Sequence, residues 1–223
     1  MTSGLSIAVD GPAAAGKSTV ARLLAERLGY RYVDTGAMYR ALTLKALECG
    51  VAPDDPPALE ALARSTVIAV EAGLRTVMDG RDVSEAIRSP EVSRAVSLVA
   101  MAPGVRRRMV EAQRSLAAGG GVVMEGRDIG TVVLPLADRK FFLTASSRER
   151  AARRHRELQD RGYRVDLAAL EAEMALRDRL DSEREADPLT PAGDAVQVDT
   201  TGKGIEQVVG ELLDLCRPGD GRR

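Results

Sequence analysis

A glycine-bounded loop between an apolar segment and an amphipathic segment constrains this chain more than any other feature. Residues 11–19 read GPAAAGKST, follow the apolar run at 5–9 and precede a stretch at 20–28 whose apolar residues recur every three or four positions. A strand, then G-x-x-x-x-G-K-S, then a helix is the pattern of a phosphate-binding P-loop. A flexible Gly/Ala turn with an exposed lysine is the alternative, but it would not require these flanks.

The residue types in this loop suit a nucleoside triphosphate. Backbone N–H groups of the loop and of the first helical turn attract anions, and the helix dipole adds to the attraction. Gly11 and Gly16 permit backbone angles and close approach that a side chain would prevent. We predict that Lys17 neutralises the β- and γ-phosphates and that the Ser18 hydroxyl ligates Mg²⁺. The residues expected to bind ATP are Gly11, Pro12, Ala13, Ala14, Ala15, Gly16, Lys17, Ser18 and Thr19.

Length and charge limit the function classes. A chain of 223 residues is long enough for one domain with a small inserted subdomain. Its net charge of −1 provides no global basic field, which disfavours nucleic acid as a partner. No stretch reaches transmembrane length and no secretion signal is evident, so we expect a cytoplasmic protein without a membrane partner. Cys49 and Cys216 have no metal-ligand spacing, which disfavours a zinc site or a disulfide framework.

Short apolar strands alternate with amphipathic helices along most of the chain. We expect strands at 30–33, 122–124, 140–143 and 195–198, and helices at about 37–48, 90–101, 103–118, 147–159, 167–185 and 205–216. Ser146 with Glu149 predicts a capping box, and Asp166 predicts a second helix cap. Repeated βα units with right-handed crossovers predict a three-layer α/β domain of the P-loop type, with helices on both faces of a five-stranded parallel sheet.

A different pattern interrupts this alternation. Residues 53–57 are a polar, proline-bearing break, and apolar runs at 65–70 and 75–78 flank a turn at 71–74, which predicts an antiparallel hairpin. Residues 82–88 are predicted to be a polar connector. A hairpin and helix within a βα series predict an inserted subdomain at about 55–100.

Two charged segments follow predicted strands. In DTGAMYR at 34–40, Thr35 can cap the next helix and offer its hydroxyl to an anion, while Arg40 lies just over one turn further on. A capped helix with a solvated arginine explains this segment equally well. In GRDIG at 126–130, Arg127 and Asp128 lie on a tight loop beside the phosphate site, and the alternative is a structural ion pair.

Two further groups lie on predicted helices. Arg150, Arg153 and Arg154 share one helical face, where three cations repel one another, so an unbalanced stripe predicts an anionic partner. A triphosphate fits better than nucleic acid because the total charge is near neutral and aromatic residues are scarce. Residues 177, 181 and 184 also share a face, where a solvated ladder of salt bridges is the favoured interpretation on these residues alone.

Taken together, these segments resemble the bacterial cytidylate kinase family, P-loop nucleoside monophosphate (NMP) kinases that transfer phosphate from ATP to CMP and dCMP. The matching segments are GPAAAGKST at 11–19, DTGAMYR at 34–40, GRDIGTVVLP at 126–135, FLTASSRERAARR at 142–154 and RDRLDSERE at 177–185. Ala14 departs from the glycine common in the family, and Thr35 from the serine. The resemblance implies a core at about 1–54, 101–146 and 186–216, an NMP-binding insert at about 55–100, and a lid with flanking helices at about 147–185. From its terminal position, we expect the tail at 217–223 to be disordered.

The resemblance also implies residue roles. Thr35, Arg40 and Arg127 are expected to hold the CMP phosphate, and Ser97, Arg106, Asp128 and Arg184 to surround cytosine. Arg177 and Asp181 are expected to meet the ribose hydroxyls, and Arg150, Arg153 and Arg154 to close over the transferring phosphoryl group. The residues expected to take part in catalysis are thus Lys17, Arg127, Arg150, Arg153 and Arg154. The family further implies Mg²⁺ as cofactor and a monomeric state.

The reaction needs no general base, because the attacking phosphate oxygen is already anionic at neutral pH. Its obstacle is the repulsion of two polyanions, which Mg²⁺, Lys17 and the arginines offset. A different P-loop kinase, for adenylate, uridylate or shikimate, would share residues 11–19 but would not need Arg106, Asp128 and Arg184 together. The absence of asparagine removes an N-K-x-D guanine-reading motif, which with the neutral charge opposes a nucleotide-binding switch or an RNA-binding module.

Overall fold

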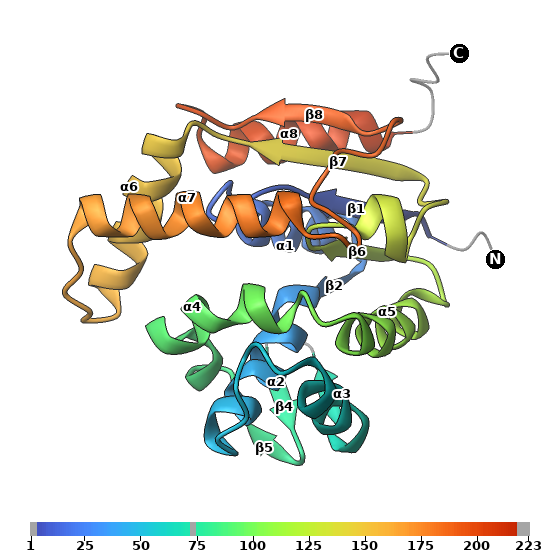
Figure 1. Ribbon diagram of the computed structural model, residues 1–223. Helices are drawn as coiled ribbons and strands as arrows, with labels where there is room; N and C mark the ends of the chain where they lie inside the picture. The colour runs from blue at the N-terminus through green and yellow to red at the C-terminus, as the bar shows by residue number, and fades with distance from the viewer. Residues whose placement is uncertain (1–3, 72–74, 218–223) are drawn as a thin grey trace.

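Five parallel strands form the central sheet of the computed structural model, which describes residues 4–71 and 75–217 (Figure 1). The strands are β1 (Ser6–Asp10), β2 (Arg31–Asp34), β6 (Val122–Glu125), β7 (Arg139–Thr144) and β8 (Val196–Asp199). Their order across the sheet is β2-β6-β1-β7-β8, and each neighbouring pair is parallel. The predicted five-stranded parallel sheet is confirmed.

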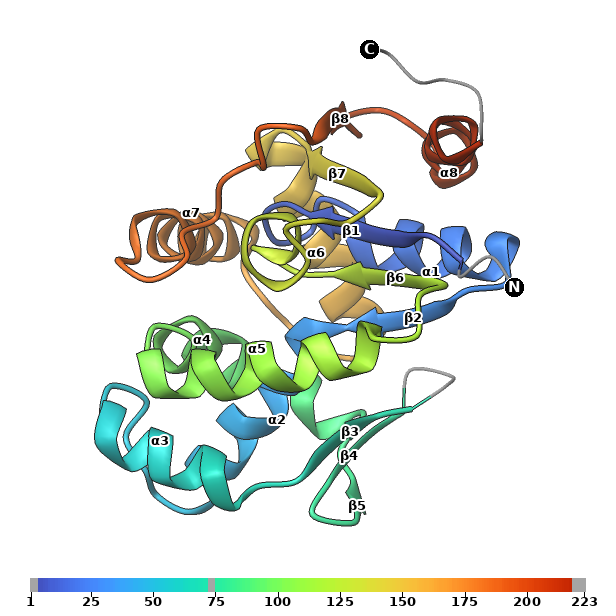
Figure 2. The same ribbon diagram turned by 90° about the vertical axis from the view of Figure 1, so that its right-hand side faces the viewer.

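Helices cover both faces of this sheet (Figure 2). The α-helices of the described residues are α1 (Lys17–Leu28), α2 (Thr35–Glu48), α3 (Pro56–Ser65), α4 (Pro90–Val99), α5 (Pro103–Ala117), α6 (Ser147–Asp160), α7 (Leu167–Glu183) and α8 (Ile205–Cys216). Of these, α1 and α8 pack on one face of the sheet and α5 on the other. Side chains alternate between the two faces of a strand. Ile7 and Val9 therefore pack in one core cluster with α1 and α8, whereas Ala8 packs in another with α5 and the turn Ile129–Val133.

The register brings acidic residues together at one edge of the sheet. Val9 and Asp34 both lie opposite Glu125, so β1, β6 and β2 end side by side. The P-loop begins directly after Asp10 at this edge. Ligands of open α/β sheets bind at the carboxyl ends of the strands, and the chain places its charged segments there.

A second, antiparallel sheet lies apart from the first (Figure 1). It contains β3 (Ile68–Val70), β4 (Thr76–Met78) and β5 (Arg81–Asp82). The predicted hairpin is confirmed in its two strands, while residues 72–74 of its predicted turn lie outside the described residues. The expectation of a connector beginning at residue 82 is wrong, because Asp82 pairs with Val77 in the third strand.

The sequence prediction missed helix α3 altogether. The proline-bearing break expected at 53–57 is in fact the start of this helix: Pro56 occupies its first turn, and the Asp55 carboxylate accepts a hydrogen bond of 3.1 Å from Ala58 N. Proline suits this position because its fixed φ is preorganised for a helix and it has no N–H to leave unpaired. Leu59 of α3 then packs with α2 and α5 in a core cluster beside the second sheet.

Two helix ends also differ from expectation. Helix α7 ends at Glu183 rather than at residue 185, which places Arg184 in extended backbone beyond the helix. Ser146 does cap α6 by accepting from Glu149 N, but Ser146 N donates to Thr201 Oγ1, so only half of the predicted capping box forms. The tail expected to be disordered spans residues 217–223. All of it except Arg217 lies outside the described residues. Among the described residues, no helix combines the length and the apolar character needed to cross a bilayer.

Candidate active site

A cavity of about 980 Å³ opens where β1, β2 and β6 end. Most residues singled out in the sequence line it together: Ala13, Ala14, Ala15, Gly16, Lys17, Ser18, Thr19, Thr35, Arg40, Ser97, Arg106, Arg127, Asp128, Arg153, Arg154, Arg177, Asp181 and Arg184. Gly11, Pro12 and Arg150 are absent from this lining. Residues up to 171 positions apart in the chain thus share one solvent-accessible space.

The P-loop depends on unusual backbone angles. Gly11 has φ 141°, and a Cβ at this position would lie 2.0 Å from Leu143 O, so a side chain here would collide with β7. Ala14 has φ 58° in the left-handed region, which favours glycine and explains why a glycine would suit this position. Gly16 precedes α1 without a side-chain cap, which leaves the first N–H groups of α1 available to an anion.

Lys17 is buried beside this loop, and its Nζ donates to Pro12 O at 2.7 Å. Burial lowers the pKa of Lys17 and the nearby Arg127 lowers it further, while Glu125 acts in the opposite direction. The pKa of Glu125 shifts in the opposite direction, because burial and then the charge of Asp34 raise it. The charge of Lys17 and hydrogen bonds with Ser18 and Tyr32 oppose this rise. An incoming phosphate would therefore favour the charged form of Lys17.

The segment after β2 is built around Asp34 rather than Thr35. The Asp34 carboxylate caps α2 by accepting from Ala37 N at 2.9 Å and also binds Arg40 Nη2 at 2.9 Å. The prediction that Thr35 caps this helix is wrong, because Asp34 occupies the capping position and Thr35 is already helical. The Thr35 hydroxyl instead donates to Glu125 O at 2.6 Å, which joins the ends of β2 and β6.

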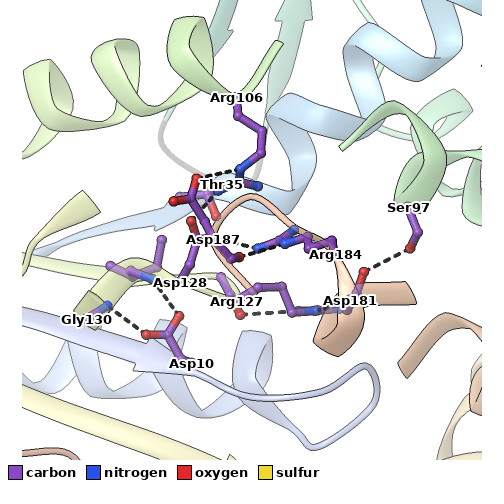
Figure 3. A network of polar contacts seen from close by, with 12 residues as sticks. Asp10, Thr35, Ser97, Arg106, Arg127, Asp128, Gly130, Asp181, Arg184 and Asp187 are labelled. Carbon is purple, nitrogen blue, oxygen red and sulfur yellow. Dashed lines mark hydrogen bonds and ion pairs between the residues drawn. The ribbon is translucent and has the colours of Figure 1, made fainter. Parts of the chain in front are cut away.

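Three buried residues that line the cavity, Arg106, Asp128 and Arg184, form a polar network with the half-buried Asp187 (Figure 3). Arg106 binds both Asp128 and Asp187, the second through Nε at 2.7 Å. Arg184 donates through Nε to Asp187 O at 2.7 Å and lies 3.6 Å from Asp128. Arg106 Nη1 and Arg184 Nη2 are buried without a hydrogen-bond partner among the described residues. Because unpaired buried donors are costly, these two atoms indicate a site for an acceptor-bearing ligand.

Asp181 of α7 connects three elements around the cavity (Figure 3). Its carboxylate accepts from Arg127 Nε at 3.0 Å and from Ser97 Oγ at 3.1 Å, and Arg177 lies 3.9 Å away. Burial alone would raise the pKa of Asp181, but Arg127 and Arg177 outweigh it and lower that pKa. Burial and Arg127 lower the pKa of Arg177 to about 10. The favoured sequence interpretation of a solvated ladder is wrong, because Asp181 is only 4 % exposed.

Comparison with known proteins identifies the group to which this chain is related. The family model described as cytidylate kinase matches residues 7–218. The chain belongs to the cytidylate kinase family. A protein of Pelotomaculum thermopropionicum named cytidylate kinase is 56 % identical over 100 % of both chains, and one of Geobacillus kaustophilus is 56 % identical over 95 % of this chain and 96 % of the relative.

Solved structures of low sequence identity support the fold. A gluconokinase of Sinorhizobium meliloti superimposes with a TM-score of 0.51 at 16 % identity, covering 95 % of this chain and 90 % of the other. A structure from Eubacterium ventriosum has the same TM-score at 12 % identity and covers 96 % and 98 %. At these identities the likeness concerns the arrangement of strands and helices alone.

In this cytidylate kinase family member, the arginine stripe of α6 is balanced. Arg150 pairs with Asp178 at 2.7 Å. Arg153 pairs with Glu149 at 3.1 Å, and Arg154 pairs with Glu157 at 2.7 Å. The argument from an unbalanced cationic stripe is therefore wrong. Arg150 differs from the other two, because it is buried and donates to the backbone oxygens Ala13 O at 3.2 Å and Ala145 O at 3.1 Å.

Sequence reasoning missed several residues of the site in this family member. Glu125 lines the cavity, and a carboxylate at the end of a buried parallel strand was a signal that could have identified it. Asp34 likewise ends a strand, and it positions Arg40. Asp187 had no such signal: it lies beyond α7 with φ 52°, and its contact with Arg106 spans 81 positions of the chain.

Proposed function

We propose that this chain transfers the γ-phosphoryl group of ATP to CMP, and to dCMP, giving CDP and dCDP. The observation that carries the proposal is that one cavity holds a P-loop with Lys17 together with the buried cluster of Arg106, Asp128 and Arg184. A P-loop alone serves many phosphoryl acceptors, whereas this cluster offers groups that distinguish cytosine. Membership of the cytidylate kinase family supports the same substrate.

For the donor, we assign the phosphates of ATP to the backbone of residues 11–19 and to Lys17. The positive φ angles of Gly11, Ala14 and Gly16 support a loop wrapped around an anion. Because Lys17 is buried and its pKa is lowered by burial, phosphate would be its natural counter-charge. The lining of the cavity by residues 13–19 supports this assignment.

The donor set also fits Mg²⁺. Ser18 is exposed, and both Ser18 and Glu125 line the cavity. The described residues contain no group of three or more His, Cys, Asp or Glu side chains that could enclose a metal. This suits Mg²⁺, which commonly uses few protein ligands and completes its octahedron with water and phosphate oxygens. We assign Ser18 as a ligand, with Glu125 beside it; when bound, Mg²⁺ would neutralise phosphate charge.

For the acceptor, we assign the CMP phosphate to Thr35, Arg40 and Arg127. Arginine suits phosphate because its planar fork binds two oxygens at once. Asp34 and Asp181 each hold one of these arginines by one side of the guanidinium, which reduces the entropy lost when phosphate binds. With both phosphates in place, catalysis consists of alignment and charge neutralisation, and no residue need abstract a proton.

Cytosine recognition is assigned to Ser97, Arg106, Asp128 and Arg184. Cytosine presents an amino donor at N4 and acceptors at N3 and O2, so Asp128 can accept from N4 while the arginines donate to N3 or O2. The unpaired nitrogens Arg106 Nη1 and Arg184 Nη2 support this match. Uracil reverses the pattern at positions 3 and 4, and each mispaired group would cost about 1–3 kcal/mol. The ribose hydroxyls are assigned to Arg177 and Asp181.

We further propose that residues at about 55–100 form the NMP-binding insert and that residues at about 147–185 form a lid with its flanking helices. Two contacts join these regions, as expected of a lid that closes over the insert: Arg154 Nη2 donates to Ser93 Oγ at 3.1 Å, and Arg161 lies 3.5 Å from Glu85. Arg153 and Arg154 are assigned to the transferring phosphoryl group. Arg150 is assigned to support of the P-loop, because its guanidinium is occupied by Ala13 O and Asp178. We also propose a cytoplasmic monomer, the oligomeric state being the one that the family resemblance implies.

The decisive experiment is a screen of CMP, dCMP, UMP, AMP and GMP as acceptors with ATP and Mg²⁺, following formation of ADP and of the diphosphate product. We expect the largest kcat/KM with CMP or dCMP. A larger kcat/KM with UMP or AMP would reject the substrate assignment and favour another P-loop kinase. Binding of ATP without transfer to any of these acceptors would instead favour a nucleotide-binding switch.

A further inference from the structure

Asp10 is the last residue of β1, directly before the P-loop, and its carboxylate is buried with 5 % of the residue exposed. It does not line the cavity. Both carboxylate oxygens accept backbone hydrogen bonds from the segment that follows Asp128: Oδ1 from Ile129 N at 2.8 Å and Oδ2 from Gly130 N at 2.7 Å (Figure 3). One side chain therefore joins the base of the P-loop to the loop that carries Arg127 and Asp128.

These two hydrogen bonds cap a short helical turn from a neighbouring strand. Ile129–Val133 is a π-helical turn, and the first N–H groups of a helical segment have no partner within it. The residue at its capping position, Asp128, forms no side-chain cap. Because Asp10 satisfies the N–H groups instead, the Asp128 carboxylate is released to bind Arg106 and to lie 3.6 Å from Arg184.

Gly130 fits closely between Asp10 and Lys140. A Cβ added to Gly130 would lie 3.2 Å from Lys140 Cδ, which is tight, and 3.4 Å from Asp10 Oδ2, which is an ordinary contact. An alanine at this position would therefore require a small shift, chiefly of the Lys140 side chain. Its effect on the contact with Asp10 should be small.

We propose that Asp10 is a positioning residue for the acceptor nucleotide: by capping the 129–133 turn, it directs the Asp128 carboxylate to the cytosine base and sets Arg127 beside the P-loop. This role rests on the CMP kinase activity proposed above. Asp10 could instead be taken for a magnesium ligand because it adjoins the P-loop. Its two backbone hydrogen bonds and its absence from the cavity lining favour the positioning role.

The charge state of Asp10 offers an independent readout. Burial raises the pKa of Asp10 to about 6, although the hydrogen bonds from Gly130 N and Ile129 N lower it. The charge of Asp128 adds to the rise, and the charge of Lys17 opposes it. Lys140, which packs against Gly130 and binds Asp194 at 2.9 Å, is a further charged side chain near the contact. Protonation would convert one acceptor oxygen into a donor facing an N–H group, and the cap would weaken as the pH falls toward 6.

The test is Asp10→Asn, which keeps the size of the side chain but replaces one acceptor oxygen with a donor. We expect the KM for CMP to rise about 10-fold and the preference for CMP over UMP to fall about 10-fold, while the KM for ATP changes less than about 2-fold. The matched control is Asp138→Asn. Asp138 accepts from Ser6 N at 2.7 Å at the opposite end of β1, away from the cavity, and its loss should leave both KM values unchanged.

A second readout is the ratio of wild-type to D10N kcat/KM for CMP between pH 5.5 and 8, in which the titration of CMP itself cancels. This ratio should be largest above neutral pH and should shrink as the pH falls below about 6. If D10N does not fold, Gly130→Ala replaces it in the test. We expect the KM for CMP to rise less than in D10N, and the KM for ATP to stay unchanged.

Three results would overturn the assignment: an unchanged KM for CMP in the folded variant, an equal rise in the KM for ATP, or a ratio that does not vary with pH. They are distinct from failure of the proposed function. In that case the wild-type protein itself would not phosphorylate CMP.

Discussion

The guanidinium of Arg127 donates through Nε to Asp181 Oδ2 at 3.0 Å, which joins the loop after β6 to helix α7. The same carboxylate receives Ser97 Oγ of α4 at 3.1 Å. Asp181 therefore lies where the core, the proposed insert and the proposed lid meet. Because one buried carboxylate holds groups from all three, its removal should affect both stability and turnover.

Asp181→Ala should lower the free energy of unfolding by about 2–4 kcal/mol, because it removes a buried carboxylate and leaves the partly buried Arg127 and Arg177 without their counter-charge. Urea unfolding at pH 7 measures this change. The matched control is Glu48→Ala, which breaks an ion pair whose Arg81 and Glu48 side chains are 56 % and 40 % exposed, and it should cost about 0–1 kcal/mol. Similar losses in the two variants would contradict the burial argument. Since folding lowers the pKa of Asp181, its stabilisation is present above the ordinary Asp pKa and is lost as the pH falls through the lowered value.

Arg127→Ala and Arg40→Ala should each lower kcat/KM for CMP by about 10- to 100-fold, because each removes charge-assisted hydrogen bonds to the acceptor phosphate. The KM for ATP should change little. Steady-state kinetics with each substrate varied in turn provide the measurement. Arg108→Ala is the control, since Arg108 pairs with Glu111 at the surface and does not line the cavity. Near-wild-type kcat/KM for CMP in both variants would refute the assignment.

Lys17→Met should inactivate the enzyme while stabilising its ligand-free fold. Turnover should fall by at least about 100-fold, because the phosphates lose their buried cation. The fold should gain stability, because a buried cation with a lowered pKa is replaced by an apolar side chain of similar length. Full activity in this variant would contradict the P-loop role. Lys45→Met is the control, since Lys45 lies outside the cavity and pairs with Asp79 at 2.6 Å.

The lowered pKa of Lys17 predicts that the stability advantage of K17M depends on pH. Folding lowers the pKa of Lys17, so the unfolded chain binds more protons between that value and the ordinary lysine pKa near 10.4. Wild-type stability should therefore rise across this range relative to that of K17M. Denaturant unfolding of both proteins at pH 7 and pH 9 measures the difference. An advantage of K17M that does not shrink at pH 9 would show that Lys17 is not the group responsible.

Asp128→Asn should relax base selection. An amide can donate to the O4 of uracil, which a carboxylate cannot, so the ratio of kcat/KM for CMP over UMP should fall by about 10- to 100-fold. The unfolding midpoint should also fall, because Arg106 and Arg184 lose a shared buried counter-charge. An unchanged ratio of kcat/KM values with a lowered midpoint would restrict Asp128 to a structural role.

Local patterns were sufficient for much of this protein. The G-x-x-x-x-G-K-S motif with its flanking strand and helix predicted the P-loop, because backbone angle and helix position are encoded within a few residues. Alternating apolar runs predicted the parallel sheet for the same reason. Helix α3 was missed because Pro56 was taken as a break, although proline is equally suited to the first turn of a helix.

The partners of the charged side chains were decided by the tertiary structure. Arg150 and Arg153 share a helical face in the sequence, yet α7 supplies Asp178 to Arg150, which then supports the P-loop rather than lining the cavity. Asp10 and Gly130 are 120 positions apart, and their contact follows from the placement of β6 beside β1. Local sequence determines which residues can cap, turn or bind, whereas only the packing of distant elements determines which charges meet and which remain for a ligand.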